Sequence, residues 1–403
     1  MRTLKVCICG GGRTAHLYAA LFSHVTDVEV SVYTQKAIEL CATMPPKGLL
    51  AVLPDGREYQ GRPQNISNNP CDTVVGAEVV ILAVPAHVRA FILTSIAPFV
   101  DRHHPVFVGA IPGNAGFDWL ADRMLPPNVV IWGTKDPPYT AYDLVHGISV
   151  AAGGGPRTHV FACHKQGAGN QVGELQHILE HLFQVDFILA NSFLELTLAF
   201  GNPVLHLPAL YGLVGPHSDN PDAKFTGQQG WWRDLTELGA AYIEDCAAEQ
   251  YQLIKRVRAE LGCNLASLTP LRDDLLRNYQ DFIADGSSLH TIFKTNRAFK
   301  GMVPLVRAGN GIGFEIDFSH RIFYEDTHFG LSLLVAIARR LNVDMPRLEE
   351  IAAWAETLSE PLFGRATDYL PPDFPQNASD IAVQHNQAPI VAQTTRNTHV
   401  YDQ

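Results

Sequence analysis

The chain has 403 residues, of which 46% are hydrophobic and 18% charged, so it can bury a large core and is not disordered as a whole. Its formal net charge of −11 argues against a nucleic-acid binder and against docking on an anionic membrane. Seven cysteines without metal-ligand spacing, no apolar run that could cross a membrane and no leader before the first strand predict a cytoplasmic protein with reduced thiols.

Strand and helix patterns alternate through the first half of the chain. An apolar strand over 4–9 precedes a helix over 14–23 and a second strand over 28–33. The stretch 49–60, with an Asp-Gly turn at its centre, predicts a β-hairpin. Further apolar strands are expected at 79–84, 105–111 and 129–132. This alternation predicts a Rossmann-type, doubly wound α/β domain over residues 1–190.

After about residue 190 the pattern becomes helical. Helices are expected at 194–200, 234–261, 270–285 and 330–341. We therefore expect an all-α second domain over residues 191–370. Residues 371–403 are rich in Pro, Asn and Gln and poor in apolar side chains, so they are expected to form a mobile extension.

A glycine-rich turn joins the first strand to the first helix. Its sequence, Gly10-Gly11-Gly12-Arg13-Thr14-Ala15, has the form G-x-G-x-x-A. In such a turn Gly10 permits the tight bend, Gly12 lets the backbone approach a pyrophosphate, and Ala15 keeps the helix close to the sheet. The helix N-terminus offers free N–H groups to the phosphates. A βα turn without a ligand has the same pattern, but the α/β context favours a dinucleotide site at Gly10, Gly11, Gly12, Arg13 and Ala15.

The end of the second strand does not decide between NAD and NADP. It reads Tyr33-Thr34-Gln35-Lys36 and lacks the carboxylate that would bind the ribose hydroxyls of NAD. Lys36 either meets a 2′-phosphate or is a solvated surface lysine. We include Thr34 in the predicted cofactor site. Pro85 and Ala86 are included as well, because they follow the fourth strand, where the nicotinamide-side ribose lies in this fold.

Two segments of the second half carry groups suited to acid–base chemistry, Gly201 to Leu210 and Arg321 to Leu331. A histidine such as His206 with a carboxylate partner is a general acid/base that works near neutral pH. An arginine offers a bidentate grip on a carboxylate. Spacing alone cannot pair residues so far apart in a chain with 17 histidines. No two histidines show a metal-ligand pattern such as H-E-x-x-H, so no metal site is expected.

Together these segments resemble the opine dehydrogenases, the octopine dehydrogenase type included. The matching stretches are Asn202 to Pro208 (Asn-Pro-x-x-His-Pro-like), Arg321 to Leu331 (Arg-Tyr-x-x-Glu-Asp-x-x-x-Gly-Leu, with Ile322 for Tyr), Asn296 to Gly301, Pro112 to Phe117, and Ala15-His16. The resemblance extends from residue 1 to about residue 360.

The resemblance implies a nucleotide-binding domain followed by a helical domain, with NAD(H) as cofactor and NADP(H) as the alternative. It implies that His206 is the acid/base, that Asp326 is its partner, and that Arg321 binds a substrate carboxylate. It places Asn114 near the keto acid and Asn202 among the substrate-binding residues. Two other interpretations stay open: Arg321 and Asp326 could pair with each other, and Asn202 could hydrogen-bond within the fold.

The implied reaction is the reductive condensation of an amino acid or amine with a 2-oxo acid, pyruvate by the resemblance, in a monomer or homodimer. Three departures stand out: Lys135 lies where arginine-using members carry an acidic residue, Tyr142 lies where the family has Arg, and 268–282 contains no Trp. We therefore expect an amine that is smaller or less basic than L-arginine.

Two other classes of protein compete with this interpretation. One is a two-domain dehydrogenase of the ketopantoate reductase or glycerol-3-phosphate dehydrogenase type, which depends on a lysine that the region around His206 lacks. The other is a non-catalytic dinucleotide-binding sensor, which would have no reason to bring His206, Asp326 and Arg321 together. The relative positions of these side chains distinguish the classes.

Overall fold

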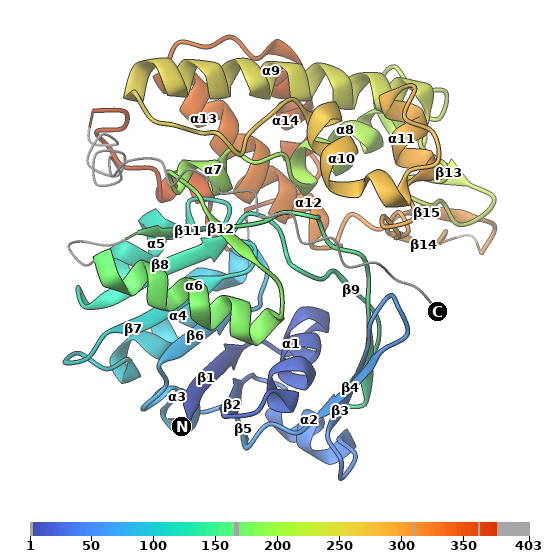
Figure 1. Cartoon of the computed structure of the whole chain (residues 1–403). Helices are drawn as coiled ribbons and strands as arrows, with labels where there is room; N and C mark the ends of the chain where they lie inside the picture. Colours follow the sequence, from blue (N-terminus) through green and yellow to red (C-terminus); the bar gives the residue numbers. More distant parts are fainter. Residues whose placement is uncertain (1–2, 165–168, 310, 362, 377–403) are drawn as a thin grey trace, which may run out of the picture.

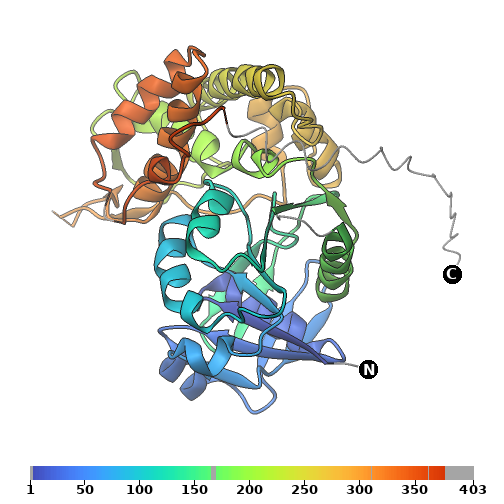
Figure 2. The same cartoon turned by 90° about the vertical axis from the view of Figure 1, so that its left-hand side faces the viewer.

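The structure is a computed structural model that describes residues 3–164, 169–309, 311–361 and 363–376. Figures 1 and 2 show two parts, one built around a twisted sheet and the other mostly helical, with the long helix α9 (Glu237–Leu261) across its outer side. Among the described residues, no helix combines the length and the apolar character that a membrane span requires.

The main sheet has eight strands in the order β12-β11-β8-β7-β6-β1-β2-β5. Its strands are β1 (Leu4–Cys9), β2 (Val28–Tyr33), β5 (Asn65–Ser67), β6 (Val79–Leu82), β7 (Val106–Ala110), β8 (Val129–Thr134), β11 (His159–His164) and β12 (Phe187–Leu189). All neighbours from β5 to β8 are parallel, whereas β11 runs antiparallel to β8. This is the doubly wound order, so the predicted fold class of the first half is confirmed.

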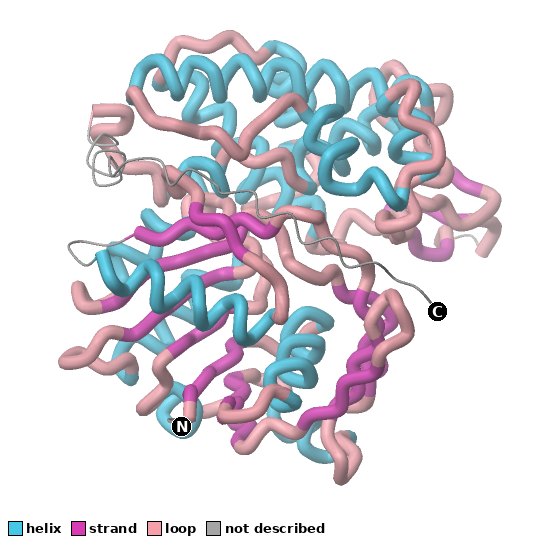
Figure 3. Tube along the Cα trace, in the orientation of Figure 1, coloured by secondary structure: helices cyan, strands magenta, loops and turns pink. Residues whose placement is uncertain are grey.

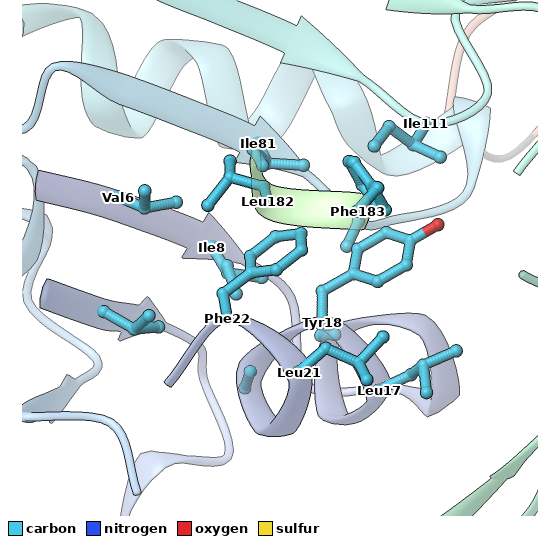
Figure 4. Close-up of a cluster of buried hydrophobic side chains, with 14 of the residues drawn as sticks. Val6, Ile8, Leu17, Tyr18, Leu21, Phe22, Ile81, Ile111, Leu182 and Phe183 are labelled. Carbon is cyan, nitrogen blue, oxygen red and sulfur yellow. The ribbon is translucent and has the colours of Figure 1, made fainter. Parts of the chain in front are cut away.

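Helices cover both faces of this sheet. The helices α1 (Arg13–His24) and α6 (Gly169–Phe183) lie on one face, and α3 (Pro70–Val74), α4 (Arg89–Ile96) and α5 (Phe117–Met124) lie on the other. Figure 4 shows the first face, where Tyr18 and Phe22 of α1 meet Phe183. The Phe22 and Phe183 rings are 4.9 Å apart at 90°. Because both sheet faces are buried, the strands are apolar runs without polar alternation.

A second sheet lies beside α1. The predicted hairpin forms as β3 (Leu49–Val52) and β4 (Glu58–Gly61), which pair antiparallel. Two strands that the sequence pattern did not indicate, β9 (Ala141–Val145) and β10 (Ser149–Ala152), complete the order β4-β3-β10-β9. The strand β10 joins β3 from about 100 residues away in sequence, a pairing for which no local pattern exists. The short helix α2 (Ala37–Thr43) follows β2.

The second half is built mainly from helices. They are α7 (Leu194–Thr197), α8 (Asn202–Val214), α9, α10 (Leu271–Tyr279), α11 (Leu289–Thr295), α12 (Ile322–Asp326), α13 (Ser332–Arg340) and α14 (Pro346–Glu356). Figure 3 also shows a small group of strands at the edge of this part: β13 (Lys224–Phe225), β14 (Leu305–Arg307) and β15 (Phe314–Ile316). The second domain is therefore mainly helical, and these three short strands correct the prediction that it is all-α. Strands of two or three residues are too short to leave a period-two pattern.

The segment expected to form a mobile extension begins in contact with the helical part. Phe374 is buried, and the Arg340 guanidinium donates to the carbonyl oxygen of Pro372 at 2.7 Å. Phe374 thus anchors the start of this segment through its buried aromatic ring, while residues 372, 373 and 376 are exposed. The remainder of the predicted extension, 377–403, lies outside the described residues.

Candidate active site

The glycine-rich turn has the geometry of a phosphate-binding loop. Gly10 has a φ of +146°, and a Cβ there would lie 2.6 Å from the carbonyl oxygen of Ala83 at the end of β6. A Cβ on Gly12, in contrast, would meet no atom within 4 Å. No side chain caps α1, so the first N–H groups of that helix are available to an anion. Gly10 is therefore needed for packing, while Gly12 leaves open space that a pyrophosphate can occupy.

The turn lies against the end of β2. A Cβ on Gly11 would come within 2.3 Å of Thr34 Oγ1, so glycine is required for this approach. Thr34 is buried and its hydroxyl oxygen accepts from the backbone N–H of Lys36 at 3.2 Å. Ala15 is buried, whereas Arg13 and Lys36 are exposed. The predicted cofactor residues of the turn and of β2 thus lie together.

His16, which entered the sequence analysis only as part of the family resemblance, holds this turn in place. Its Nδ1 lies 2.8 Å from the carbonyl oxygen of Gly12, and its Nε2 accepts from the backbone N–H of Gly147 at 2.9 Å. Burial lowers the pKa of His16, which favours the neutral ring that this pair of bonds requires. The loop between β9 and β10 is thereby tied to the phosphate-binding turn.

The other predicted cofactor residues, Pro85 and Ala86, lie where the two halves of the chain meet. The backbone N–H of Ala86 donates to Glu325 Oε1 of α12 at 3.0 Å. Glu325 also pairs with the Arg321 guanidinium and faces His87 Nδ1 at 3.7 Å. Burial acts to raise the pKa of Glu325, but these partners outweigh it and lower the pKa to about 2. An ionised carboxylate therefore links α12 to the C-terminal edge of the sheet.

His206 and Asp326 are in contact. His206 Nδ1 lies 3.0 Å from Asp326 Oδ2, and the two side chains are only 14% and 6% exposed. A carboxylate accepts hydrogen bonds, so Nδ1 carries the proton, and Nε2 has no hydrogen-bond partner in the described part of the chain. Burial raises the pKa of Asp326, although His206 acts in the opposite direction. The pair can take up and release a proton at Nε2.

The motif residues that flank this pair are packing partners. Asp326 ends α12 and is followed by a π-helical turn over Thr327–Leu331, a rare form that recurs at functional sites. A Cβ on Gly330 would lie 2.2 Å from Pro203 Cγ, so only glycine lets the start of α8 lie on this turn. The Asn-Pro and Gly-Leu patterns thus bring His206 within reach of Asp326.

Two tryptophans stack on His206, and no sequence pattern predicted this contact. The ring centroids of His206 and Trp231 are 4.5 Å apart at 27°, and those of His206 and Trp232 are 5.7 Å apart at 25°. The backbone N–H of Trp231 donates to the carbonyl oxygen of Gly301 at 3.1 Å, so the third family motif supports this stack. An indole face attracts a protonated imidazole. The adjacent Trp-Trp pair was the one available signal, and nothing local tied it to His206.

The remaining predicted substrate residues occupy different surroundings. Arg321 is 53% exposed and pairs with Glu325, so the alternative of an ion pair with Asp326 is wrong: Asp326 is taken by His206. Asn114, after β7, is half-buried and its Oδ1 accepts from Arg89. Asn202 is exposed in the first turn of α8, one helical turn before His206, and among the described residues no hydrogen bond or ion pair joins its side chain to His206 or Asp326. No group of three or more metal-ligating side chains occurs among the described residues.

Lys135, at the end of β8, is buried and its charge is balanced. Its Nζ lies 3.1 Å from Asp274 Oδ1 of α10 and 3.4 Å from the carbonyl oxygen of Ser267. Tyr279, also on α10, packs edge-on against Phe299 with ring centroids 4.9 Å apart. The segment that lacks tryptophan therefore still supplies an aromatic ring to this region.

Comparison with known proteins identifies the family. Residues 189–359 match the family described as "NAD/NADP octopine/nopaline dehydrogenase, alpha-helical domain". The chain is 38% identical to an uncharacterised protein, y4xO, of Sinorhizobium fredii over 93% of this chain and 100% of that protein. It is 27% identical to octopine dehydrogenase of Mizuhopecten yessoensis over 88% of this chain and 90% of that enzyme.

A solved structure shares the fold. Octopine dehydrogenase with NADH and L-arginine superposes with a TM-score of 0.75 at 24% identity, over 88% of this chain and 89% of that one. The match covers both the sheet domain and the helical domain. The chain belongs to the opine dehydrogenase family.

Proposed function

We propose that this protein is an NADH-dependent opine dehydrogenase that joins an amino acid or amine to a 2-oxo acid, with pyruvate as the oxo acid. The amine nitrogen and the keto carbon form an imine with loss of water. Reduction of the C=N bond then gives an N-(1-carboxyalkyl) amino acid. The nicotinamide cofactor supplies the hydride for this reduction and is oxidised to NAD⁺, and one proton is consumed.

The contact between His206 and Asp326 carries this proposal. The imidazole holds its Nδ1 proton toward the buried carboxylate, so Nε2 is the atom that exchanges a proton with the reacting nitrogen. Asp326 stabilises the charged imidazolium, and the Trp231 face adds to this effect. A sensor without catalytic activity has no need of such a pair, and a lysine-dependent dehydrogenase would need a lysine in its place.

The glycine-rich turn fits a nicotinamide cofactor, and the resemblance to octopine dehydrogenase, solved with NADH, supports NADH over NADPH as the proposal. The open space at Gly12 and the uncapped start of α1 suit a pyrophosphate. Thr34 and Lys36 at the end of β2 provide no carboxylate for the ribose hydroxyls, so the preference rests on the resemblance alone and is tested by measuring both dissociation constants. Tighter binding of NADPH than of NADH would refute it.

The substrates are assigned to three further polar side chains. Arg321 binds a substrate carboxylate, Asn114 lies near the keto acid, and Asn202 completes the substrate-binding set. The amine is smaller or less basic than L-arginine, because Lys135 and Asp274 together leave no net negative charge for a guanidinium. Efficient formation of octopine from arginine and pyruvate would contradict this assignment.

The experiment is an absorbance assay of NADH oxidation with pyruvate and a panel of amino acids and amines, followed by mass analysis of the product. The expected result is oxidation that requires both substrates and yields a secondary amine. Oxidation with pyruvate alone, giving a hydroxy acid, would indicate an ordinary 2-hydroxy-acid dehydrogenase. The absence of oxidation with every amine, in a protein that binds NADH, would overturn the proposal.

A further inference from the structure

Arg89, at the start of α4, is a buried cation without a direct ion pair. The residue is 3% exposed, and no carboxylate of the described part of the chain lies within ion-pair distance of its guanidinium. Burial lowers the pKa of Arg89 to about 10, although the more distant Glu325 acts in the opposite direction, so the side chain remains charged at neutral pH. Since a buried charge without a partner is costly, its position requires an explanation.

The guanidinium is bound to the loop that follows β7. It donates through Nη1 to the carbonyl oxygen of Asn114 at 2.6 Å and through Nη2 to that of Pro112 at 2.8 Å. A third bond, at 2.9 Å, runs from Nη2 to Oδ1 of the Asn114 side chain. All three acceptors are neutral oxygens, so they do not cancel the charge, and the buried Nε has no hydrogen-bond partner in the described part of the chain.

These bonds determine which way the Asn114 amide faces. A guanidinium has only donors, so the amide atom beside it must be the oxygen and not the nitrogen. The Nδ2 group, with two donors, therefore points away from Arg89 and has no acceptor in the described part of the chain. Asn114 follows the C-terminal end of β7, the edge at which ligands bind in a doubly wound sheet.

We propose that Arg89 is a positioning residue for the 2-oxo acid: it turns the Asn114 amide so that Nδ2 donates to the substrate, and its uncancelled charge favours an anion there. This inference rests on the proposed function. A clamp that only stabilised the loop would need neither a fixed amide orientation nor an unbalanced charge.

The variant Asn114→Asp separates the two roles. An aspartate at this position would pair with Arg89 and cancel the buried charge, so thermal unfolding should shift upward by about 2 °C or more. The same change replaces two donors by a negative charge beside an anionic substrate, so KM for pyruvate should rise about tenfold or more. KM for the amine and the dissociation constant of NADH should change little.

Variants of Arg89 complete the test. Arg89→Met should raise KM for pyruvate by a similar factor, and Arg89→Lys, which keeps the charge but places its donors on a single nitrogen, should restore part of the affinity. Arg123 is the matched control, since its guanidinium also donates to two backbone carbonyls, of Asp368 and Tyr369, at 2.8 Å each. Arg123→Met should lower the melting temperature without changing KM for pyruvate.

Two results would overturn the inference. One is a lower melting temperature in Asn114→Asp, which would mean that Arg89 carries no unbalanced charge. The other is an unchanged KM for pyruvate in Asn114→Asp and Arg89→Lys. Failure of the proposed function can be told apart from failure of this inference. In the first case the wild-type protein would not oxidise NADH with any amine, and the melting temperatures would still report on the Arg89–Asn114 contact.

Discussion

The substitution Asp326→Asn tests the catalytic pair most directly. It leaves the size of the side chain unchanged and removes the charge that faces His206 Nδ1. The amide oxygen can still accept from Nδ1, but it no longer stabilises an imidazolium. We expect the protein to fold normally and the turnover number to fall. The reason is that the imidazolium, which carries the second proton at Nε2, is less stable without the facing carboxylate.

The magnitude follows from the distance between the two groups. Opposite unit charges 3.0 Å apart attract each other by about 5.5 kcal/mol at an effective dielectric constant of about 20. The amide recovers part of this through its own hydrogen bond, worth about 1 kcal/mol, and surrounding dipoles recover more. A loss of about 2–4 kcal/mol remains, which corresponds to a kcat lowered about 30- to 1,000-fold. His206→Ala removes the acid/base itself and should lower kcat by about 10²- to 10⁴-fold.

The assay is steady-state oxidation of NADH with saturating pyruvate and amine, alongside binding of NADH and thermal unfolding. An exposed pair of the same kind, His104 Nδ1 with Asp101 Oδ2 at 2.9 Å, provides the control. Asp101→Asn and His104→Ala should leave kcat unchanged. The reasoning is refuted if Asp326→Asn keeps wild-type kcat, or if its kcat falls only in proportion to a loss of folded protein.

Three other predictions concern the surrounding groups. Gly12→Val should raise the dissociation constant of NADH about tenfold or more with no change in melting temperature, because a Cβ there meets only open space in the free protein; equal NADH affinity would contradict the phosphate site. The pKa of Glu325 is lowered from 4.5 to about 2, so its stabilising contribution is present above the ordinary value and is lost as pH falls from about 4.5 through about 2. In acid-unfolding titrations Glu325→Gln should therefore remove up to about 3 kcal/mol of stability near pH 6 and have little effect near pH 2; a constant difference across this range would exclude the carboxylate as the cause. Trp231→Leu should lower kcat about 5- to 30-fold and Trp231→Phe much less, because the stack on His206 depends on an aromatic face; equal rates for the two variants would leave packing as the sole role of the ring.

Local sequence was sufficient for the first strands of the first domain, but not for β9 and β10. Strands β1 and β2 begin and end at the predicted residues, because a buried parallel strand is a short apolar run bounded by turn residues. The glycine turn was recognisable for a similar reason, since its glycines, helix start and strand are contiguous. The helix α8 was not predicted, because it is apolar on nearly every side and contains Pro208, and both features hide a 3.6-residue period.

Local sequence has the same limit for the two catalytic candidates, His206 and Asp326. Sequence motifs singled out His206 and Asp326 separately, and the family resemblance paired them, but no local pattern reports a contact between residues 120 positions apart. That contact depends on the π-helical turn and on the packing of Gly330 against Pro203.

The tertiary structure alone decided which groups surround the pair. The stack of Trp231 on His206, the bond from Ala86 to Glu325 and the turning of the Asn114 amide by Arg89 all join separate elements. A sequence determines the period and the ends of each element through interactions among neighbours in the chain. Which side chains face one another across two domains depends on how whole helices and strands pack. Each such contact therefore depends on many residues that are distant in the sequence.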